Sequence, residues 1–302
     1  MGVGDRKKVR VGILGASGYT GAELVRLLLG HDNVEIAVLT GNTQAGQAFS
    51  TVYPQFHYAK HLPDLTKHAD HDWMDVDCVF CCLPHATTQE IISQLPKHLK
   101  ASGFHIIVDL SADFRLKDVD TYAKWYGGEH KAPALQKEAV YGLTELAREE
   151  VRGARLVANP GCYPTAAQLP LIALFKAGII LPDDIIIDAK SGTTGAGRSP
   201  KQGTLFCEIA DGINAYGVGE HRHAPEIEQG LGEASGKDVI VNFTPHLMPM
   251  SRGILETIYV KLAEGKTVED AKNALENAYA EEHFVTVLPG SAVPHTRHVR
   301  GR

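Results

Sequence analysis

The segment NPGCYPT places a cysteine where covalent chemistry is possible. Cys162 follows Asn-Pro-Gly and begins a helix-like run that extends to about Ala177, with Pro164 tolerated in its first turn. A thiol at a helix N-terminus lies at the positive end of the helix dipole, which favours the nucleophilic thiolate. Burial as a small core residue is the commoner role of cysteine. The Asn-Pro-Gly turn, however, has no evident packing purpose and suits presenting one side chain to a ligand, so we expect a nucleophile here.

A nucleophilic thiol needs a proton acceptor, and the segment YGVGEHRHAPEIEQG contains the candidates. His221 and His223 point the same way if this stretch is extended, and Glu226 follows three residues later. The same three residues could ligate zinc, but no further ligands of suitable spacing are evident nearby, so we expect no metal. Cys78 and Cys81 lie three apart on a strand-like run and therefore face opposite sides, which is typical of core cysteines.

A glycine-rich turn follows the first predicted strand in VRVGILGASGYTGAEL. Gly15 suits a tight turn, Gly18 the close approach of a pyrophosphate, and Gly21 the packing of the following helix on the sheet. The spacing G-x-x-G-x-x-G also fits an ordinary turn of an α/β protein. The second strand, VEIAVLT, ends without the acid that an NAD site usually carries there, and residues 42–44 read NTQ. This pattern favours NADP over NAD.

Two segments offer cations near expected loops. DLSADFR places Arg115 beyond the end of a parallel strand, where the ligands of such sheets gather, and SGTTGAGRSPK is a glycine-rich loop that contains Arg198. Either arginine could be a solvated surface charge. Together with a nucleotide loop and a thiol, they suggest a substrate that carries carboxylate or phosphate.

The composition narrows the class of protein. The 302 residues are 44% hydrophobic and 22% charged, with a formal charge of −6. No apolar run approaches the ~20 residues of a membrane helix, so we expect no membrane span. The negative charge disfavours a broad nucleic-acid-binding face and leaves small molecules as the expected partners. The five cysteines form no spaced framework, which predicts free thiols in a reducing compartment, and the N-terminal leader lacks the features of a signal or transit peptide.

Two domains are expected to position these residues. Strand and helix signals alternate through the first half, so residues 1–158 should form a Rossmann-type, doubly wound parallel sheet that binds NADP. Residues 159–302 should form an α+β catalytic domain with a mixed sheet. In TVEDAKNALENAYA, Thr267 and Asp270 come close to a capping box, and one helix face should contain Val268, Ala271, Leu275 and Ala278.

Eight motifs in order carry a family resemblance. GASGYTGAEL, CCLPHATTQE, DLSADFR, YGLTEL, LVANPGCYPT, SGTTGAGR, HRHAPEIEQ and VPHTRHVRG resemble the N-acetyl-gamma-glutamyl-phosphate reductases of arginine biosynthesis, over essentially the whole chain from about Val9. The resemblance implies that the Cys162 thiolate attacks the acyl phosphate and forms a thioester. NADPH then reduces this thioester to N-acetylglutamate 5-semialdehyde, with His221 as the acid/base residue.

The resemblance also implies the binding residues. The expected cofactor contacts are Gly15, Ala16, Ser17, Gly18, Tyr19, Thr20, Thr40, Gly195 and Ala196, and the expected substrate contacts are Arg115, Asn159, Arg198 and His223. It suggests a homo-oligomer, dimer or tetramer, built through the second domain. The expected compartment is the cytoplasm for a bacterial source and the plastid stroma for a plant source.

The chain departs from the family pattern in two ways. The family often has a basic residue just after the second strand, where this chain has NTQ, and it continues past VPHTRHVRG, whereas this chain ends at Arg302. We therefore expect weaker cofactor binding and lower stability than in a longer form. Two alternatives remain open: an enzyme like aspartate-semialdehyde dehydrogenase, and a non-catalytic NADP-binding protein.

Overall fold

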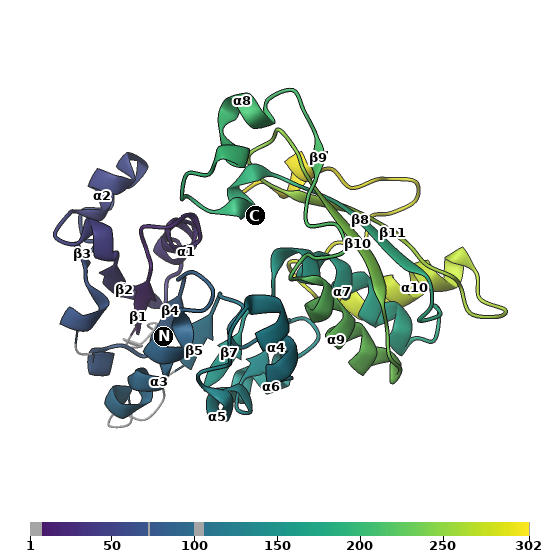
Figure 1. Ribbon diagram of the computed structural model, residues 1–302, viewed down its shortest axis with the longest axis horizontal. Coiled ribbons are helices and arrows are strands. Elements are labelled where there is room, and N and C mark those ends of the chain that lie inside the picture. Colours follow the sequence, from purple (N-terminus) through teal and green to yellow (C-terminus); the bar gives the residue numbers. More distant parts are fainter. Residues whose placement is uncertain (1–7, 72, 100–105, 302) are drawn as a thin grey trace, which may run out of the picture. The chain divides into compact units, whose positions relative to one another are not determined.

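The computed structural model describes residues 8–71, 73–99 and 106–301; the leader and the first residue of the expected strand HIIVDLS lie outside them. The chain divides into two compact units (Figure 1). The first contains Met1–Gly142 and Ala147–Pro160, and the second contains Leu143–Leu146 and Gly161–Arg302. The division falls two residues beyond the expected boundary at residue 158. Sequence reasoning did not anticipate that residues 143–146 join the second unit.

The first unit is a parallel sheet with helices, and this confirms the predicted doubly wound class. The strand order is β3-β2-β1-β4-β5-β7-β6, and every pairing is parallel. The strands are β1 Val9–Leu14, β2 Val34–Thr40, β3 Leu65–Thr66, β4 Cys78–Cys81, β5 Ile106–Asp109, β6 Val140–Tyr141 and β7 Leu156–Ala158. The helices are α1 Tyr19–Leu29, α2 Phe49–Val52, α3 Thr88–Leu99, α4 Val119–Tyr126, α5 Pro133–Gln136 and α6 Arg148–Gly153.

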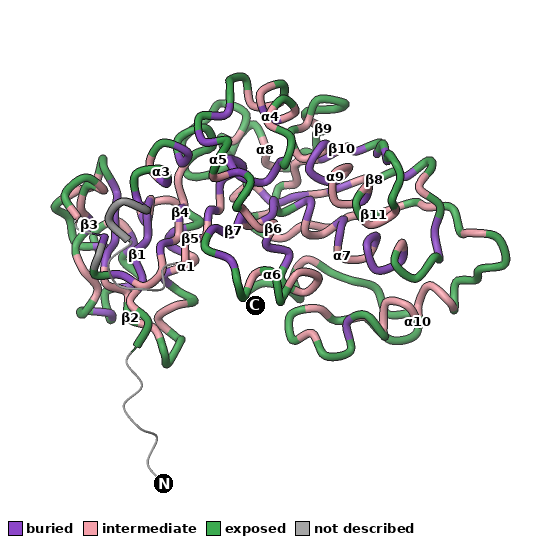
Figure 2. Tube along the Cα trace, turned by 90° about the horizontal axis from the view of Figure 1, so that it is seen from below, coloured by how far each residue is buried: buried purple, intermediate pink, exposed green. Residues whose placement is uncertain are grey.

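Two apolar clusters pack on opposite faces of this sheet. Leu14 and Cys81 belong to one cluster, whereas Ile13 and Cys78 belong to the other, because neighbouring strand residues alternate between the faces. Figure 2 shows buried residues along the central strands β1, β4, β5 and β7. The expected core role of Cys78 and Cys81 on opposite sides of their strand is confirmed.

The second unit contains a mixed sheet, as expected. β8 Ile185–Ser191 pairs in parallel with β10 Val241–Leu247, while β11 Ile254–Tyr259 and β9 Asn214–Ala215 form the antiparallel edges. Its helices are α7 Cys162–Lys176, α8 Phe206–Ile209, α9 Ala224–Ser235 and α10 Val268–Tyr279. Figure 1 shows α7, α9 and α10 on one side of this sheet. No helix in the described part of the chain is long and apolar enough to cross a bilayer.

Helix α10 begins as predicted, and its buried side includes only part of the predicted apolar face. The Thr267 hydroxyl accepts from the Asp270 amide and the Asp270 carboxylate accepts from the Thr267 amide, which completes the capping box. Of the predicted apolar face, Ala271 and Leu275 are half-buried, whereas Val268 is 79% exposed and Ala278 is also exposed. Tyr279 is buried instead and donates to the Leu169 carbonyl. Packing against α7 determines that the Tyr279 side of α10 is buried. The periodicity of the sequence within the helix does not indicate which residue meets α7.

Glu256 on β11 is a buried carboxyl without a partner. It lies opposite Ala189 of β8, whose side chain is fully buried on the helix-covered side of the sheet. Neither carboxyl oxygen has a hydrogen-bond partner among the described residues. Burial raises the pKa of Glu256 from its ordinary value of 4.5 to about 8. The folded state therefore retains a proton on this side chain that the unfolded chain has already released at neutral pH.

This carboxyl should make the protein less stable as pH rises. The contribution of this carboxyl to the free energy of unfolding is fully present below the unfolded pKa of 4.5. It is lost as pH increases toward the folded pKa of about 8. Glu256→Gln stays neutral, so its advantage over the parent in unfolding free energy should grow by roughly 2–4 kcal/mol across that window. Urea unfolding at several pH values measures this, with exposed Glu264→Gln as control. Parallel pH profiles for parent and Glu256→Gln would contradict the assignment.

Candidate active site

Cys162 is the first residue of α7, and a buried carboxylate fixes the turn before it. The thiol is exposed. The amide of Gly161, the N-cap residue, donates to Oε1 of Glu226 at 2.8 Å, and Glu226 is only 1% exposed. The Thr165 hydroxyl donates to the Gly161 carbonyl at 2.9 Å. Both polar groups of the residue before Cys162 are therefore engaged, so the thiol is presented at the helix N-terminus in one orientation.

The strand end that leads into this turn is held separately. Nε of Arg115 donates to the Asn159 carbonyl at 2.8 Å, and Nη2 donates to the Leu110 carbonyl at 2.8 Å. Arg115 is 5% exposed, and the Asn159 amide donates to the Asp109 carbonyl at 2.8 Å. Arg115 is thus a clamp on backbone carbonyls, which the sequence did not indicate. Asn159 keeps a half-buried side chain whose Nδ2 donates to the Pro160 carbonyl.

A buried polar network positions the turn that carries Arg115. The Thr88 hydroxyl donates to Asp113 at 2.7 Å, and the Ser111 hydroxyl donates to Asp109 at 2.7 Å. Burial is the main cause that raises the pKa of Asp109 to about 6, against the lowering effect of the Ser111 hydrogen bonds. Sequence reasoning quoted both segments, CCLPHATTQE and DLSADFR, but missed this role. The sequence did contain a signal for this network: small polar residues lie in the segments that follow two predicted parallel strands.

His221 lies in an aromatic setting. Its ring contacts the rings of Tyr163 at 5.6 Å, His223 at 4.9 Å and Phe243 at 5.2 Å between centroids. Burial, followed by the charge of Arg222, lowers the pKa of His221 to about 4. The imidazole is therefore neutral at physiological pH. His223 occupies the N-cap position of α9 and is half-buried.

Two tyrosines connect this histidine with the thiol. The hydroxyls of Tyr163 and Tyr216 share a hydrogen bond of 2.8 Å, and both rings contact His221 edge-on. Burial raises the pKa of Tyr216, the hydrogen bond with Tyr163 lowers it, and the negative charge of a Cys162 thiolate raises it. Cys162 and His221 therefore share the same aromatic neighbours. Sequence reasoning missed both tyrosines, although each lies within five residues of a residue it had selected.

The arrangement does not resemble a zinc site. Glu226 faces the Gly161 amide, while His221 and His223 lie among aromatic rings. Within residues 8–71, 73–99 and 106–301, no group of three His, Cys, Asp or Glu side chains lies close enough to hold a metal ion.

The glycine turn lies at the point where the first sheet reverses its strand order, between β1 and β4. Gly15 has a φ of 76°, and a Cβ there would meet the Cys82 carbonyl oxygen at 2.6 Å. A Cβ on Gly21 would lie 2.6 Å from the Ala16 Cα. Gly18 is different, because a Cβ there would meet only the Gly15 carbonyl at an ordinary 3.5 Å. The protein itself requires glycine at Gly15 and Gly21 but leaves open space beside Gly18.

Groups from the second strand and beyond hold this turn in place. The buried Thr40 hydroxyl accepts from the Gly15 amide at 3.2 Å, and the Thr40 carbonyl accepts from the Ala16 amide at 2.7 Å. The Tyr53 hydroxyl donates to the Ser17 carbonyl at 2.9 Å. Tyr19 and Thr20 are exposed at the start of α1, where no side chain caps the helix and no acid occupies the first turn. This helix end can receive an anion.

The loop with Gly195, Ala196 and Arg198 belongs to the second unit. The Thr193 amide donates to the Met250 carbonyl at 2.9 Å, and the Thr194 amide donates to the Ser251 carbonyl at 3.1 Å. Gly195, Ala196 and Arg198 are exposed beyond this anchored segment. The loop therefore has a fixed base and an accessible tip.

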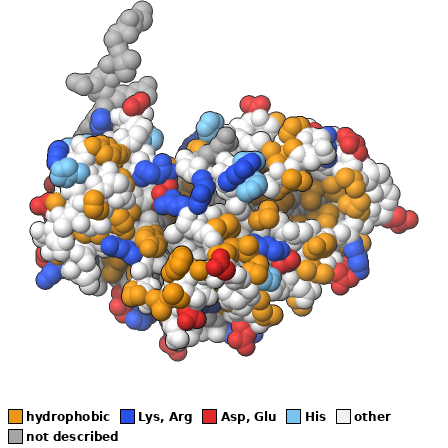
Figure 3. Space-filling model, turned by 90° about the horizontal axis from the view of Figure 1, so that it is seen from above, with side chains coloured by type: hydrophobic (Ala, Val, Ile, Leu, Met, Phe, Trp, Pro, Cys, Tyr) orange, Lys and Arg blue, Asp and Glu red, His pale blue; other side chains and the backbone are white. Residues whose placement is uncertain are grey.

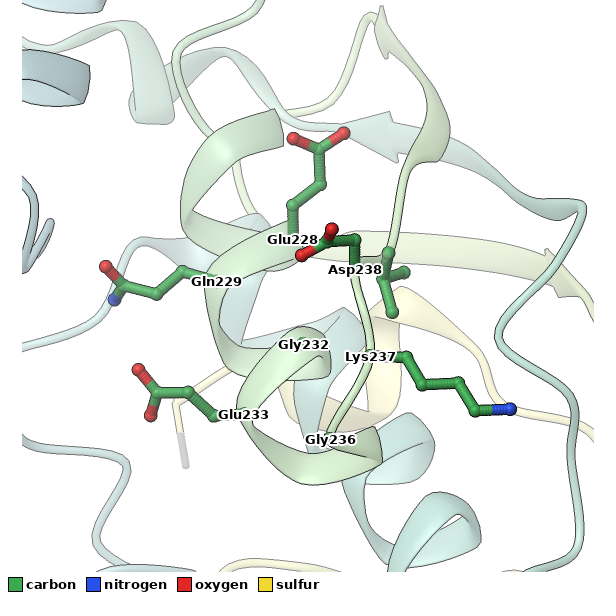
Figure 4. A pocket seen from close by; sticks show the side chains of 8 residues that line it. Glu228, Gln229, Gly232, Glu233, Gly236, Lys237 and Asp238 are labelled. Atoms are coloured by element: carbon green, nitrogen blue, oxygen red, sulfur yellow. The ribbon is translucent and has the colours of Figure 1, made fainter.

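A hollow of about 660 Å³ lies elsewhere, at the C-terminal end of α9. Figure 4 shows that its side chains do not converge: Gln229 and Glu233 point to one side, and Lys237 points to the other. Glu228 accepts from the Val241 amide at 3.1 Å. None of the residues selected for chemistry lines this hollow, so we assign no catalytic role to it.

Glu226 should restrain the reactivity of Cys162 while holding its turn. A carboxylate at the N-terminus of α7 opposes the helix dipole that stabilises a thiolate. Glu226→Gln keeps an oxygen acceptor for the Gly161 amide but removes the charge, so alkylation of Cys162 near neutral pH should accelerate several-fold. The rate is measured in a Cys207→Ser background, because Cys207 is the other exposed cysteine of the described chain.

Two further variants complete this experiment. Glu226→Ala leaves the Gly161 amide without its acceptor and should reduce stability by about 1–3 kcal/mol. Exposed Glu233→Gln, on the same helix, should change neither rate nor stability. Slower alkylation in folded Glu226→Gln than in the parent would refute this electrostatic effect.

Comparison with known proteins identifies the family. Residues 10–154 match the NAD binding domain of semialdehyde dehydrogenases, and residues 162–302 match their dimerisation domain. The chain is 58% identical over 295 residues to an N-acetyl-gamma-glutamyl-phosphate reductase of Rhodospirillum rubrum, covering 98% of this chain and 83% of the relative. It is 56% identical over 300 residues to a probable chloroplastic N-acetyl-gamma-glutamyl-phosphate reductase of Oryza sativa subsp. japonica, covering 99% and 71%.

Solved structures agree with the fold. An aspartate semialdehyde dehydrogenase II from Vibrio cholerae superposes with a TM-score of 0.67 at 15% identity, covering 98% of this chain and 85% of that one. The enzyme from Candida albicans, solved with NADP, gives 0.58 at 17% identity and covers 89% and 76%. The family expected from the eight motifs is confirmed: the chain belongs to the N-acetyl-gamma-glutamyl-phosphate reductases.

Proposed function

We propose that this chain catalyses the NADPH-dependent reduction of N-acetyl-gamma-glutamyl phosphate to N-acetylglutamate 5-semialdehyde, with release of phosphate. The observation that carries the proposal is the exposed Cys162 thiol at the N-terminus of α7, in a turn held by Glu226 and beside the His221 ring system. The names of the relatives supply the substrate. This activity makes the chain a phosphorylating aldehyde dehydrogenase of arginine biosynthesis.

The proposed chemistry passes through the cysteine. The Cys162 thiolate attacks the acyl carbon, a C–S bond forms, and the C–O bond to phosphate breaks with its electron pair on the leaving oxygen. Bound NADPH supplies the hydride that adds to the thioester carbon. The C–S bond then breaks, which releases the aldehyde and restores the thiolate. The single proton that the overall reaction consumes ends on phosphate.

The glycine turn of the first unit suits the cofactor. The open space beside Gly18, together with the uncapped and acid-free start of α1, fits a pyrophosphate held by residues 15–20. Asn42 and Thr43 are exposed after β2, where no acid would repel a 2′-phosphate. Thr40 contributes by fixing the turn, since its hydroxyl is already bonded to Gly15. We assign Gly195 and Ala196 to the nicotinamide end.

Four residues are proposed for the substrate's carboxylate and phosphate. Arg198 is exposed and His223 is half-buried next to His221, so both can reach a ligand. Arg115 and Asn159 are more restricted, because Nε and Nη2 of the guanidinium bind backbone carbonyls. We assign both residues a contribution through the position of the turn that carries Cys162.

The direct test is the reverse reaction. The purified chain should reduce NADP⁺ when given N-acetylglutamate 5-semialdehyde and phosphate, and it should do so faster with NADP⁺ than with NAD⁺. Cys162→Ser should lower kcat/KM by at least about 1,000-fold, because serine is a far weaker nucleophile at neutral pH. Cys207→Ser, which changes the other exposed cysteine of the described residues, should retain activity.

Controls separate the alternatives. Reaction without phosphate, or equal activity on aspartate semialdehyde, would contradict the proposed substrate. NADP⁺ binding without any turnover would favour a non-catalytic binding protein.

We also propose that the chain forms a homo-oligomer through the open face of its second sheet. Ile186 and Tyr259 are 44% and 57% exposed on this face, opposite the helices. Figure 3 shows hydrophobic side chains gathered in a hollowed area of the second unit, seen from above. The family description of residues 162–302 as a dimerisation domain supports this surface.

The proposed compartment is the plastid stroma for a plant source, as the Oryza sativa relative's name suggests, and the cytoplasm for a bacterial one.

A charge on this face should separate the subunits. Light scattering should give a dimer or tetramer for the parent and a monomer for Ile186→Glu, because each copy would bury an unpaired carboxylate. Val268→Glu, which changes a 79% exposed side chain on α10, should leave the mass unchanged. A monomeric parent would end the proposal, and an unchanged mass for Ile186→Glu would place the interface elsewhere.

A further inference from the structure

One hydrogen bond defines where His221 carries its proton. The backbone amide of His223 donates to Nδ1 of His221 at 3.2 Å. A backbone N–H can only donate, so Nδ1 must offer its lone pair and carries no hydrogen. Because the low pKa of about 4 keeps the ring neutral, its single proton lies on Nε2.

The described groups around the ring are aromatic side chains and one cation, and none of them favours the other tautomer. Tyr163 of α7 and Phe243 of β10 pack edge-on against it, as do Tyr216 and His223 from its own segment. The charged group that acts on it is the neighbouring Arg222, which disfavours a second positive charge. No carboxylate among the described residues bonds to Nδ1, in contrast to catalytic triads, where an acid holds an Nδ1–H and leaves Nε2 free to accept a proton.

This tautomer has a chemical consequence. An Nε2 that already carries a hydrogen has no lone pair for the proton of a thiol, and the Nδ1 lone pair is occupied by the His223 amide. Nε2–H can instead donate to an oxygen on which negative charge develops. The reaction proposed above needs that donor and needs no base on the enzyme once the thiolate is present, since the only proton consumed ends on phosphate.

We propose that His221 acts as a neutral Nε2–H donor to the carbonyl oxygen of the substrate in both tetrahedral intermediates, and not as the base that ionises Cys162. The inference rests on the proposed reductase function. The thiolate then forms by loss of its proton to solvent and is stabilised by the N-terminus of α7. His223 acts on this step through its backbone as a positioning residue.

The tautomer can be observed directly without turnover. In protein with ¹⁵N-labelled histidine, the His221 ring, assigned by loss of its signals in His221→Ala, should show a protonated Nε2 and an unprotonated Nδ1 near neutral pH. His223→Ala retains the backbone amide and should keep this pattern. His223→Pro removes that amide at a φ of −83°, close to the range of proline, and should populate the Nδ1–H form. A protonated Nδ1 in the parent overturns the proposal, whether or not His223→Pro folds.

Kinetics provide a second, independent readout. A glutamine can donate a hydrogen bond but cannot act as a base, so His221→Gln should retain at least about tenfold more kcat than His221→Ala. Alkylation of Cys162 in the Cys207→Ser background should follow one ionisation, with His221→Gln within about threefold of the parent. Equal loss of kcat in both variants, or a second ionisation that disappears in His221→Gln, would show that the imidazole is the base.

These readouts separate the two proposals. If the parent lacks phosphate-dependent turnover, the proposed function fails, whereas the ring spectrum and the alkylation profile still decide the tautomer.

Discussion

The bond between the Gly161 amide and the Glu226 carboxylate is the constraint on which the second unit's chemistry depends. It joins the N-terminus of α7, where the thiol lies, to α9, which starts just after His221 and His223. The same region is reinforced by Gln168, whose Nε2 donates to the Glu226 carbonyl at 2.7 Å. A Cβ on Gly230 would lie 2.4 Å from that Gln168 nitrogen, so a larger residue there would displace the Gln168 amide from its hydrogen bond. One pair of helices therefore positions both the proposed nucleophile Cys162 and His221.

In the first unit, hydrogen bonds of backbone groups and the absence of side chains at two glycines fix the turn after β1. Gly15 and Gly21 allow the turn after β1 to close against β4 and α1, and Thr40 binds both Gly15 and Ala16. The start of α1 then presents amide groups without a competing cap or acid. A rigid turn with open space beside Gly18 fits a pyrophosphate better than a flexible loop would, because little ordering remains to be done on binding.

The aromatic setting of His221 connects electrostatics with the reaction. Burial among Tyr163, Tyr216 and Phe243 keeps the imidazole neutral, and the His223 amide selects one of its two neutral forms. A neutral donor in a poorly solvated site stabilises a developing oxyanion without adding a positive charge that would hold the phosphate product. In the proposed mechanism, the N-terminus of α7 favours thiolate formation and the imidazole polarises the substrate carbonyl.

The sequence by itself determined the fold class, the family and the capping box of α10, because glycine spacing, strand and helix periodicity and short motifs are local. It also selected Cys162 and His221, whose roles remain proposals. It did not predict that Arg115 binds backbone carbonyls, that Thr88 and Asp109 share a buried network, or that Tyr279 is the buried residue of α10. Each of these depends on groups distant in the chain, and only the packed structure decides which of them meet. The protonation of His221 depends on both levels. The His223 amide that binds Nδ1 is two residues away in the sequence, whereas the neutral state of the ring results from its burial in the folded unit.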